Sequence, residues 1–281
     1  MNKASGPKGH SNNLNMVRTI SVILPCFNEE TAVSPVLERL RTLSEEWLGR
    51  QIQLLEVLIV DDGSTDGTRQ AVDQWNASFN QKDHFTLKVL THDARQGYGA
   101  AIKTGIASAQ GGYVAFYDVD GTYDPIVLPN MIEALERENA EMVCGDRLSK
   151  CEHMPYTREF GNRLFVGTIN MLYRTRVYDS CTGMRLFTRN MSDFFSSRAL
   201  PNGLDYSLAM TLAFLRTGHR LVEIPIPYAK RIGRSKLSVL ADGPRFFIRI
   251  LSSWIHTPLH LREVADARKQ LLQSSVVTKK K

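Results

Sequence analysis

Residues 54–68 of this chain read LLEVLIVDDGSTDGT. The first seven are apolar except for Glu56, and they end abruptly at Asp61, Asp62 and a run of Gly, Ser and Thr. Strands that are apolar on both faces are typical of a parallel sheet covered by helices on both sides, and open sheets of this kind bind ligands beyond the carboxyl ends of their strands. Gly63 and Ser64 are residues that commonly form turns, but a turn alone does not explain the adjacent carboxylates of Asp61 and Asp62. The segment therefore predicts an α/β protein with a polar site after this strand.

Apolar runs alternate with amphipathic stretches along the rest of the chain. Strands are expected at residues 19–24, 54–60, 86–90, 113–117 and 141–144, with a strand broken by prolines at 221–227. Helices are expected at about residues 30–47, 68–79, 100–109, 124–138, 203–215 and 244–256. This alternation of strand and helix predicts a Rossmann-like, mostly parallel sheet with helices on both faces.

Two further polar clusters follow apolar strands, PCFNEE at residues 25–30 and DVDGTY at residues 118–123. The fold would bring both to the same edge of the sheet as the DDGST turn. Asp118 and Asp120 alternate with Val119, so an extended backbone would point both carboxylates the same way. Mg²⁺ or Mn²⁺ relieves the repulsion within such a pair and takes further ligands from substrate phosphates. A lone DxD is usually a solvated turn, but this one ends a buried strand beside two polar clusters and favours a divalent metal site.

The run GYGAAI at residues 97–102 resembles a dinucleotide-binding loop in its first glycines only. Its sixth residue is Ile102, and it follows the third expected strand instead of the first, which argues against a dinucleotide oxidoreductase. We expect it to open a helix whose amino end lies against a neighbouring loop or a phosphate.

The chain has 281 residues, of which 43% are hydrophobic and 23% charged, and its net charge is +6. This is enough for one sizeable core. A basic excess suits nucleic acid, anionic lipid or a phosphorylated substrate. Only the net charge points to nucleic acid, and no motif supports it, so no nucleic-acid partner is expected. The four cysteines form no CxxC pair, so no zinc site or disulfide framework is expected. Polar residues 1–17 and the basic end, 266–281, are expected to be disordered tails, and no apolar stretch reaches the roughly 20 residues that span a bilayer.

Six runs together make the chain recognisable: SVILPCFNEE, VLIVDDGSTDGT, GYGAAIKTG, YDVDGTYDP, CTGMRLF and IPYAKRIGRSKL. They resemble family 2 glycosyltransferases, most closely the dolichol-phosphate mannosyltransferase-like branch that includes bacterial polyprenyl-phosphate hexosyltransferases. The RIGRSK run at residues 231–236 is the part most specific for the lipid-phosphate branch. The resemblance implies a GT-A fold over residues 18–240 and an inverting hexosyltransferase that depends on Mg²⁺ or Mn²⁺.

The resemblance also implies roles for individual residues. The nucleotide-sugar pocket would be formed by Pro25, Phe27, Asn28, Glu29, Asp61, Asp62, Ser64, Gly97, Asp118, Val119 and Asp120. Asp118 and Asp120 would also hold the metal. Thr122 stands where the family often has a glutamine, so no metal contact is assigned to it.

Cationic residues in the second half of the chain would bind phosphate. Arg147 and Arg185 would reach the donor or acceptor phosphate, although an ordinary ion pair is the plain alternative for each. A mobile loop would close over the diphosphate and the acceptor phosphate through Arg231, Gly233, Ser235 and Lys236. The alternative for this loop is a solvated charge run.

The acceptor decides whether a catalytic base is needed. A polyprenyl phosphate is anionic at neutral pH and needs no base, whereas a sugar hydroxyl does. Asp205, in NGLDYS, lies where many family 2 enzymes place a carboxylate near the acceptor. It is a candidate for a base, an orienting group or a helix N-terminal acid. GDP-mannose and UDP-glucose both fit as donors. Transfer to a sugar hydroxyl of a growing glycan, and nucleotide binding without catalysis, stay open as alternatives.

Residues 241–265 are expected to contain an amphipathic helix. At about 100° per residue, its apolar face collects Phe246, Phe247, Ile248, Ile250, Leu251, Trp254 and Ile255. Such a face either packs on the core or lies in a membrane interface. We expect a peripheral protein at the cytoplasmic face of a membrane, where it docks through this helix or through a separate membrane protein subunit.

Overall fold

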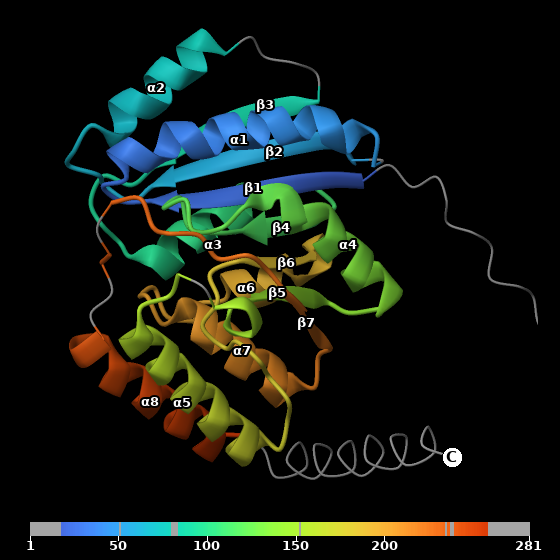
Figure 1. The fold of residues 1–281 in the computed structure, drawn as a ribbon, viewed down its shortest axis with the longest axis vertical. Helices are drawn as coiled ribbons and strands as arrows, with labels where there is room; N and C mark the ends of the chain where they lie inside the picture. Colours follow the sequence, from blue (N-terminus) through green and yellow to red (C-terminus); the bar gives the residue numbers. More distant parts are fainter. Residues whose placement is uncertain are drawn as a thin grey trace, which may run out of the picture.

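The computed structural model describes residues 18–50, 52–79, 84–151, 153–233, 235–236 and 239–257. Its centre is one seven-stranded sheet with the order β3-β2-β1-β4-β6-β5-β7, which runs from top to bottom in Figure 1. All strands are parallel except β6, which pairs antiparallel with β4 and with β5. The strands are β1 Arg18–Cys26, β2 Ile52–Asp61, β3 Phe85–Thr91, β4 Tyr113–Phe116, β5 Met142–Asp146, β6 Arg185–Thr188 and β7 Leu221–Pro225.

Helices cover both faces of this sheet. One face packs against α1, α2 and α4, and the other packs against α3, α6 and α7. The helices are α1 Glu30–Leu48, α2 Thr68–Ser78, α3 Tyr98–Ser108, α4 Leu128–Arg137, α5 Tyr156–Tyr173, α6 Ser192–Ser196, α7 Tyr206–Thr217 and α8 Val239–Ile255, with short 3₁₀ turns at Pro125–Val127, Leu148–Lys150 and Arg189–Met191. The predicted mostly parallel sheet with helices on both faces is confirmed.

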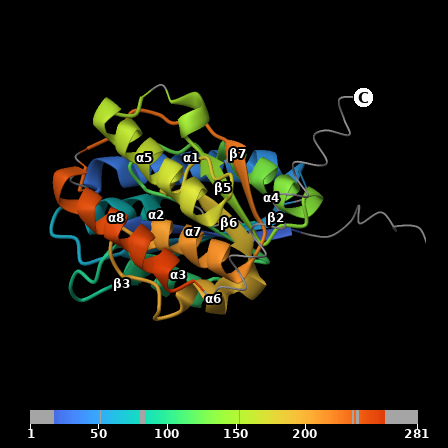
Figure 2. The same ribbon diagram turned by 90° about the horizontal axis from the view of Figure 1, so that it is seen from below.

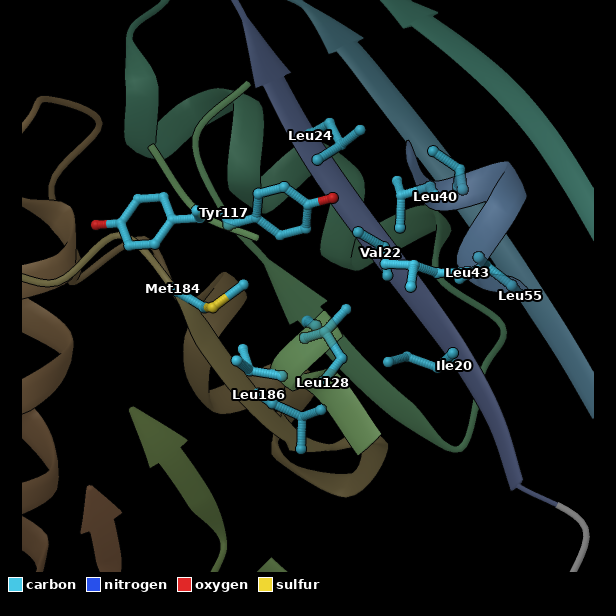
Figure 3. Close-up of a cluster of buried hydrophobic side chains, with 14 of the residues drawn as sticks. Ile20, Val22, Leu24, Leu40, Leu43, Leu55, Tyr117, Leu128, Met184 and Leu186 are labelled. Carbon is cyan, nitrogen blue, oxygen red and sulfur yellow. The ribbon is translucent and has the colours of Figure 1, made fainter. Parts of the chain in front are cut away.

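The core explains why the strands are apolar on both faces. Successive side chains of a strand point to opposite faces of the sheet. On β1, Ile20, Val22 and Leu24 enter the cluster beneath α1 and α4, which Figure 3 shows in close-up, whereas Ile23 enters the cluster beneath α3 and α7. All four are fully buried, so each face of β1 contributes to a core.

The strand order creates one crevice at the carboxyl ends of the strands. The chain runs outward from β1 through β2 to β3 and then returns to place β4 on the other side of β1. The connections after β1 and β4 therefore leave in opposite directions, which is where open α/β sheets bind their ligands.

A third core cluster extends the molecule beyond the sheet. It joins α5, α7 and α8 through Ile169, Tyr173, Leu208, Leu212, Phe246 and Ile250. Figure 2 views the molecule from this end, where α5 and α8 lie side by side. None of the helices in the described residues is long and apolar enough to cross a membrane.

The structure differs from the sequence prediction at β6, α5, α6 and α8. Strand β6 has four residues and α6 has five, too few for a clear pattern. Helix α5 has buried and exposed apolar residues around its circumference, so it shows no single apolar face. Helix α8 starts at Val239, so the expected domain boundary at residues 240/241 falls inside it. The tails predicted at 1–17 and 266–281, and the end of the 241–265 segment beyond Thr257, lie outside the described residues.

Candidate active site

A pocket of about 210 Å³ lies at the carboxyl ends of β1, β2 and β4. Its floor comes from the turns after these strands, and its walls come from α5, α8 and the 228–236 segment. The predicted residues that line it are Pro25, Phe27, Glu29, Asp62, Asp118, Val119, Asp120, Arg147, Arg231, Ser235 and Lys236. The fold therefore brings together most of the expected site from five separate parts of the chain.

The turns after β1 and β2 are fastened to each other by short polar side chains. The Asn28 N–H donates to Ser64 Oγ over 3.0 Å, and the Thr65 N–H donates to Asn28 Oδ1 over 2.8 Å. Asp61 Oδ1 accepts the Ser64 N–H at 2.9 Å. Asn28, Asp61 and Ser64 do not line the pocket. They shape the turns that present Phe27 and Glu29 to it.

Asp62 is buried and holds the turn that precedes α3. Its carboxylate accepts the N–H groups of Gln96 and Gly97, both at 2.8 Å, and lies 2.7 Å from Nδ1 of His92. Gly97 has φ +109°, and a Cβ there would come within 2.4 Å of the Asn202 carbonyl oxygen. Gly97 is thus required by the backbone, and Asp62 fixes the position from which α3 starts.

The wall of the pocket contains two side chains that sequence reasoning missed. The Arg95 guanidinium stacks 4.2 Å from the centroid of the Phe27 ring, which is a cation–π contact. The Tyr98 hydroxyl donates to Asp118 Oδ1 over 2.7 Å. Neither contact has a spacing that a sequence motif could reveal, because each joins turns that follow different strands.

Asp118 and Asp120 both face the pocket at the end of β4. Asp120 Oδ1 accepts the Thr122 N–H at 3.0 Å and the Thr122 hydroxyl at 2.5 Å, so Thr122 orients Asp120. Asp120 Oδ2 lies 2.6 Å from Nη1 of Arg231. Burial, with the charge of Asp120 beside it, raises the pKa of Asp118 above its ordinary range. A carboxylate whose ionisation is opposed in this way gains from a bound cation.

Gly183 leaves room beside this pair. A Cβ on Gly183 would lie 2.7 Å from Asp118 Oδ2, so any larger residue would press on the carboxylate. The Gly183 N–H donates to the Tyr123 hydroxyl over 2.8 Å. Among the described residues, no third His, Cys, Asp or Glu joins the pair. A Mg²⁺ or Mn²⁺ ion held by two carboxylates takes its other ligands from water and phosphate.

Arg147 lines the pocket within a buried ion pair. Its Nε and Nη2 donate to the Asp179 carboxylate over 2.7 and 2.9 Å, and Nη1 donates to the Tyr123 hydroxyl over 3.2 Å. The guanidinium also lies 5.4 Å from the ring centroid of Tyr228. Arg147 is therefore held in a fixed orientation against the pocket, as a rigid cation.

Two of the predicted catalytic residues lie outside the pocket lining. Arg185 is fully buried and donates to the carbonyls of Ser180 and Thr182 and to Thr211 Oγ1. It joins the turn that carries Gly183 to α7, and no contact with substrate follows from this placement. Asp205 is 3% exposed and pairs with Arg249 of α8. The residue of the CTGMR motif that lies beside Asp118 is Gly183.

The 231–236 segment lies across the pocket and is bound to both of its sides. Arg231 bridges Asp120 and Glu29, the latter at 2.8 Å, and Lys236 pairs with Glu29 and donates to the Asn28 carbonyl over 2.9 Å. The Ile232 N–H donates to the Asp120 carbonyl over 2.8 Å. Gly233 follows with φ +82°, a conformation that favours glycine. The cations of this segment are thus held on the carboxylates of the site.

A half-buried glutamate on β7 supports the turn behind this wall of the pocket. Glu223 accepts the N–H groups of Tyr178 and Asp179 at 2.8 and 2.7 Å and so holds the turn that positions Asp179 against Arg147. Burial is the main cause that raises the pKa of Glu223 to about 7, and the charges of Asp179 and Asp146 raise it further.

Stability should therefore fall as the pH rises through this pKa. The folded-state value exceeds the ordinary value of 4.5, so the contribution of Glu223 to stability is present below about pH 4.5 and lost as the pH rises through about 7. We expect the native chain to lose roughly 1–3 kcal/mol relative to Glu223→Gln between about pH 5 and about pH 8. Urea unfolding of both proteins at the two pH values measures this. A difference that does not change with pH would contradict the expectation.

Comparison with known proteins agrees with this geometry. The model of the family described as Glycosyl transferase family 2 matches residues 21–194. The chain is 29% identical over 225 residues to the dolichyl-phosphate hexose transferase of Haloferax volcanii, which covers 80% of this chain and 89% of that protein. It is 27% identical over 231 residues to the low-salt glycan biosynthesis hexosyltransferase Agl6 of the same organism. That match covers 81% of this chain and 52% of Agl6, so this chain spans about half the length of that relative.

Solved structures share the fold at lower identity. Glucosyl-3-phosphoglycerate synthase from Mycobacterium tuberculosis, in complex with Mn²⁺, UDP and phosphoglyceric acid, matches with a TM-score of 0.61 and 20% identity, over 86% of this chain and 80% of that one. Mannosyltransferase PcManGT from Pyrobaculum calidifontis, in complex with GDP-Man and Mn²⁺, matches with a TM-score of 0.61 and 19% identity, over 90% and 69%. The predicted GT-A fold is therefore confirmed.

Proposed function

Because the chain belongs to glycosyl transferase family 2, we propose that it transfers a hexose from a nucleotide sugar to a polyprenyl phosphate at a membrane surface, with inversion at the anomeric carbon. The observation that carries this proposal is the Asp118–Asp120 pair at the end of β4 with the cationic 231–236 segment lying directly across it. The first feature suits a cation and a diphosphate. The second offers further positive charge for a second, anionic substrate.

The donor would lie against the turns after β1, β2 and β4. Pro25, Phe27 and Glu29 would border the base and ribose, with Arg95 stacked on Phe27 at the same wall. GDP-mannose and UDP-glucose are both candidates, and solved structures of the same fold are complexes with GDP-Man or with UDP. The diphosphate would lie over Asp118 and Asp120.

The carboxylate pair fits a divalent cation. Asp118 and Asp120 would hold Mg²⁺ or Mn²⁺, because both face the pocket, Gly183 leaves space beside Asp118, and burial raises the pKa of Asp118. A bound cation would neutralise the charge that develops on the leaving diphosphate. With Asp120 so engaged, Arg231 would exchange its ion pair with that carboxylate for one with a phosphate.

The reaction itself needs no proton transfer to an enzyme group. An anionic phosphate oxygen of the acceptor would attack the anomeric carbon, and the bond from that carbon to the diphosphate would break, so that the nucleoside diphosphate leaves with the bonding electrons. Arg147, Arg231 and Lys236 lie where they would orient the two anionic groups and stabilise the charge on the leaving one. A hydroxyl acceptor would require a base, and Asp205, the expected candidate, is paired with Arg249 away from the pocket lining.

The acceptor also places the enzyme at a membrane. The dolichyl-phosphate hexose transferase of Haloferax volcanii is the relative that supports a lipid acceptor. The protein would work peripherally at the cytoplasmic face, docked through its own surface or through a separate membrane protein subunit. Residues 18–240 would form the catalytic unit and the 241–265 segment the contact with the membrane.

A transfer assay tests the proposal directly. Purified protein is incubated with a short polyprenyl phosphate, Mg²⁺ or Mn²⁺ and a panel of GDP- and UDP-sugars, and the products are analysed by mass spectrometry. We expect a glycosyl-phosphate lipid from one donor, with activity lost in Asp120→Asn and retained in Asp205→Asn. Release of the nucleoside diphosphate that requires Asp205 and gives no lipid product would instead assign a hydroxyl acceptor.

A further inference from the structure

Most of the large exposed apolar side chains in the described part of the chain lie on two neighbouring helices, α5 and α8. Helix α5 exposes Tyr156, Phe160, Leu164 and Met171, at 80%, 63%, 51% and 71%. At about 100° per residue these four lie within an arc of about 80°. The opposite side of α5 carries Ile169 and Tyr173, which are buried in the third core cluster. The α5 stripe therefore has no packing role within the described residues.

Helix α8 carries a second stripe beside the first. Its expected apolar face is divided in the structure: Phe246 and Ile250 pack into the core, whereas Ile248, Leu251 and Ile255 are exposed. The three exposed residues lie within an arc of about 60°. Helices α5 and α8 pack against each other at one end of the molecule (Figure 2), and their two stripes are together called the α5–α8 face.

Arginines outnumber acidic residues on these two helices and directly after α5. The two helices contain Arg158, Arg163, Arg245 and Arg249 against Glu159 and Asp242, and Arg174 and Arg176 follow α5 directly. Arg163 and Arg245 are close to the apolar stripes in helical position. Exposed apolar side chains on arginine-rich helices complement the acyl region and the anionic headgroups of a bilayer.

Residues of the same two helices line the active-site pocket. Thr157, Gly161 and Phe165 of α5, and Gly243 and Phe246 of α8, line that pocket. If the acceptor is a polyprenyl phosphate, its phosphate must enter here while its hydrocarbon chain stays in the bilayer, since each methylene withdrawn into water costs free energy. The two helices that line the pocket would then lie against the membrane.

We propose that the α5–α8 face is a docking surface for an anionic lipid bilayer, and that the α5 stripe inserts into it. This assignment of the occupant rests on the lipid-phosphate acceptor proposed above. It places α5 alongside α8 as a membrane contact, although α5 was not expected from the sequence. The apolar side chains would insert into the bilayer, and the arginines would attract negatively charged headgroups.

Vesicle co-sedimentation tests this with the full chain. The combined variant Phe160→Ser and Met171→Ser changes two exposed residues that do not line the pocket. Its affinity for vesicles of phosphatidylcholine with phosphatidylserine should fall about tenfold or more, and binding of the native chain to phosphatidylcholine alone should be weaker. The matched control is Leu48→Ser with Ile126→Ser, which are 43% and 44% exposed on other elements. The control should bind vesicles as the native chain does.

The acceptor assay separates this proposal from the proposed function. Transfer to a short, water-soluble prenyl phosphate should be unchanged in Phe160→Ser with Met171→Ser. If the native chain binds vesicles better than the variant but transfers sugar to no prenyl phosphate, the docking surface is supported and the proposed acceptor is wrong. Equal vesicle binding by native chain and variant, or none by the native chain, would overturn the docking surface. A native dimer that binds no vesicles and dissociates in the variant would assign the face to a second copy.

Discussion

Replacing Asp120 with asparagine should reduce sugar transfer by about 1000-fold or more while leaving the fold intact. Asparagine keeps the size of the side chain and an oxygen that can accept from Thr122, so the turn after β4 is preserved. It removes the charge that would hold the cation and that now pairs with Arg231. Loss of charge stabilisation at a leaving group typically has an effect of this order. Steady-state transfer rates with the best donor of the panel measure it.

Asp124→Asn provides the matched control for this variant. Asp124 lies in the turn that connects Asp120 to α4, is exposed, and pairs with Arg39. An exposed ion pair contributes only about 0–1 kcal/mol, so Asp124→Asn should keep transfer within about threefold of the native rate. Circular dichroism and thermal unfolding of both variants should match the native chain. If Asp120→Asn kept more than about a tenth of the activity, or if Asp124→Asn lost as much, the assigned role of Asp120 would be wrong.

The parallel part of the fold was predictable because burial on both faces leaves a strong signal. Residues 54–60 are almost entirely apolar, and β2 extends this run to Asp61. Strand β6 escaped prediction because four residues that begin with a buried arginine do not resemble a strand. Helix α5 escaped for a different reason, since part of its apolar surface faces outward and obscures the period. The local sequence thus predicts elements whose buried residues follow a regular period. It misses short strands such as β6 and helices such as α5, whose exposed residues are also apolar.

The residues of the site also differ in how far the local sequence could predict them. Asp118 and Asp120 were predictable because they follow one strand directly, so geometry places them together. Tyr98 and Gly183 meet Asp118 from other turns, and no spacing within the sequence announces either contact. The family resemblance of the CTGMRLF run led to the prediction that Arg185 binds a phosphate. Its side chain instead points into the core, where it donates to the Ser180 carbonyl and to Thr211 Oγ1.

Asp179→Ala should have the largest effect on stability. Asp179 is 1% exposed and Arg147 is 7% exposed, and two hydrogen bonds join the carboxylate and the guanidinium. Removing the carboxylate leaves a buried cation without its partner, which typically costs about 3–5 kcal/mol. Urea unfolding should register this loss. Transfer activity should fall too, because Arg147 would lose the contact that holds it against the pocket.

The double variant Arg147→Met with Asp179→Leu distinguishes an unpaired charge from lost packing. A buried ion pair offsets its own desolvation only in part, so removing both charges should destabilise the protein less than removing Asp179 alone. The exposed pair of Arg69 and Asp73 supplies a reference, since Asp73→Ala should change stability by only about 0.5 kcal/mol. If the double variant were as unstable as Asp179→Ala, the cost would come from packing at this wall. If Asp179→Ala were no worse than Asp73→Ala, the ion pair would not support the pocket, and Arg147 would be free to reach substrate without a fixed partner.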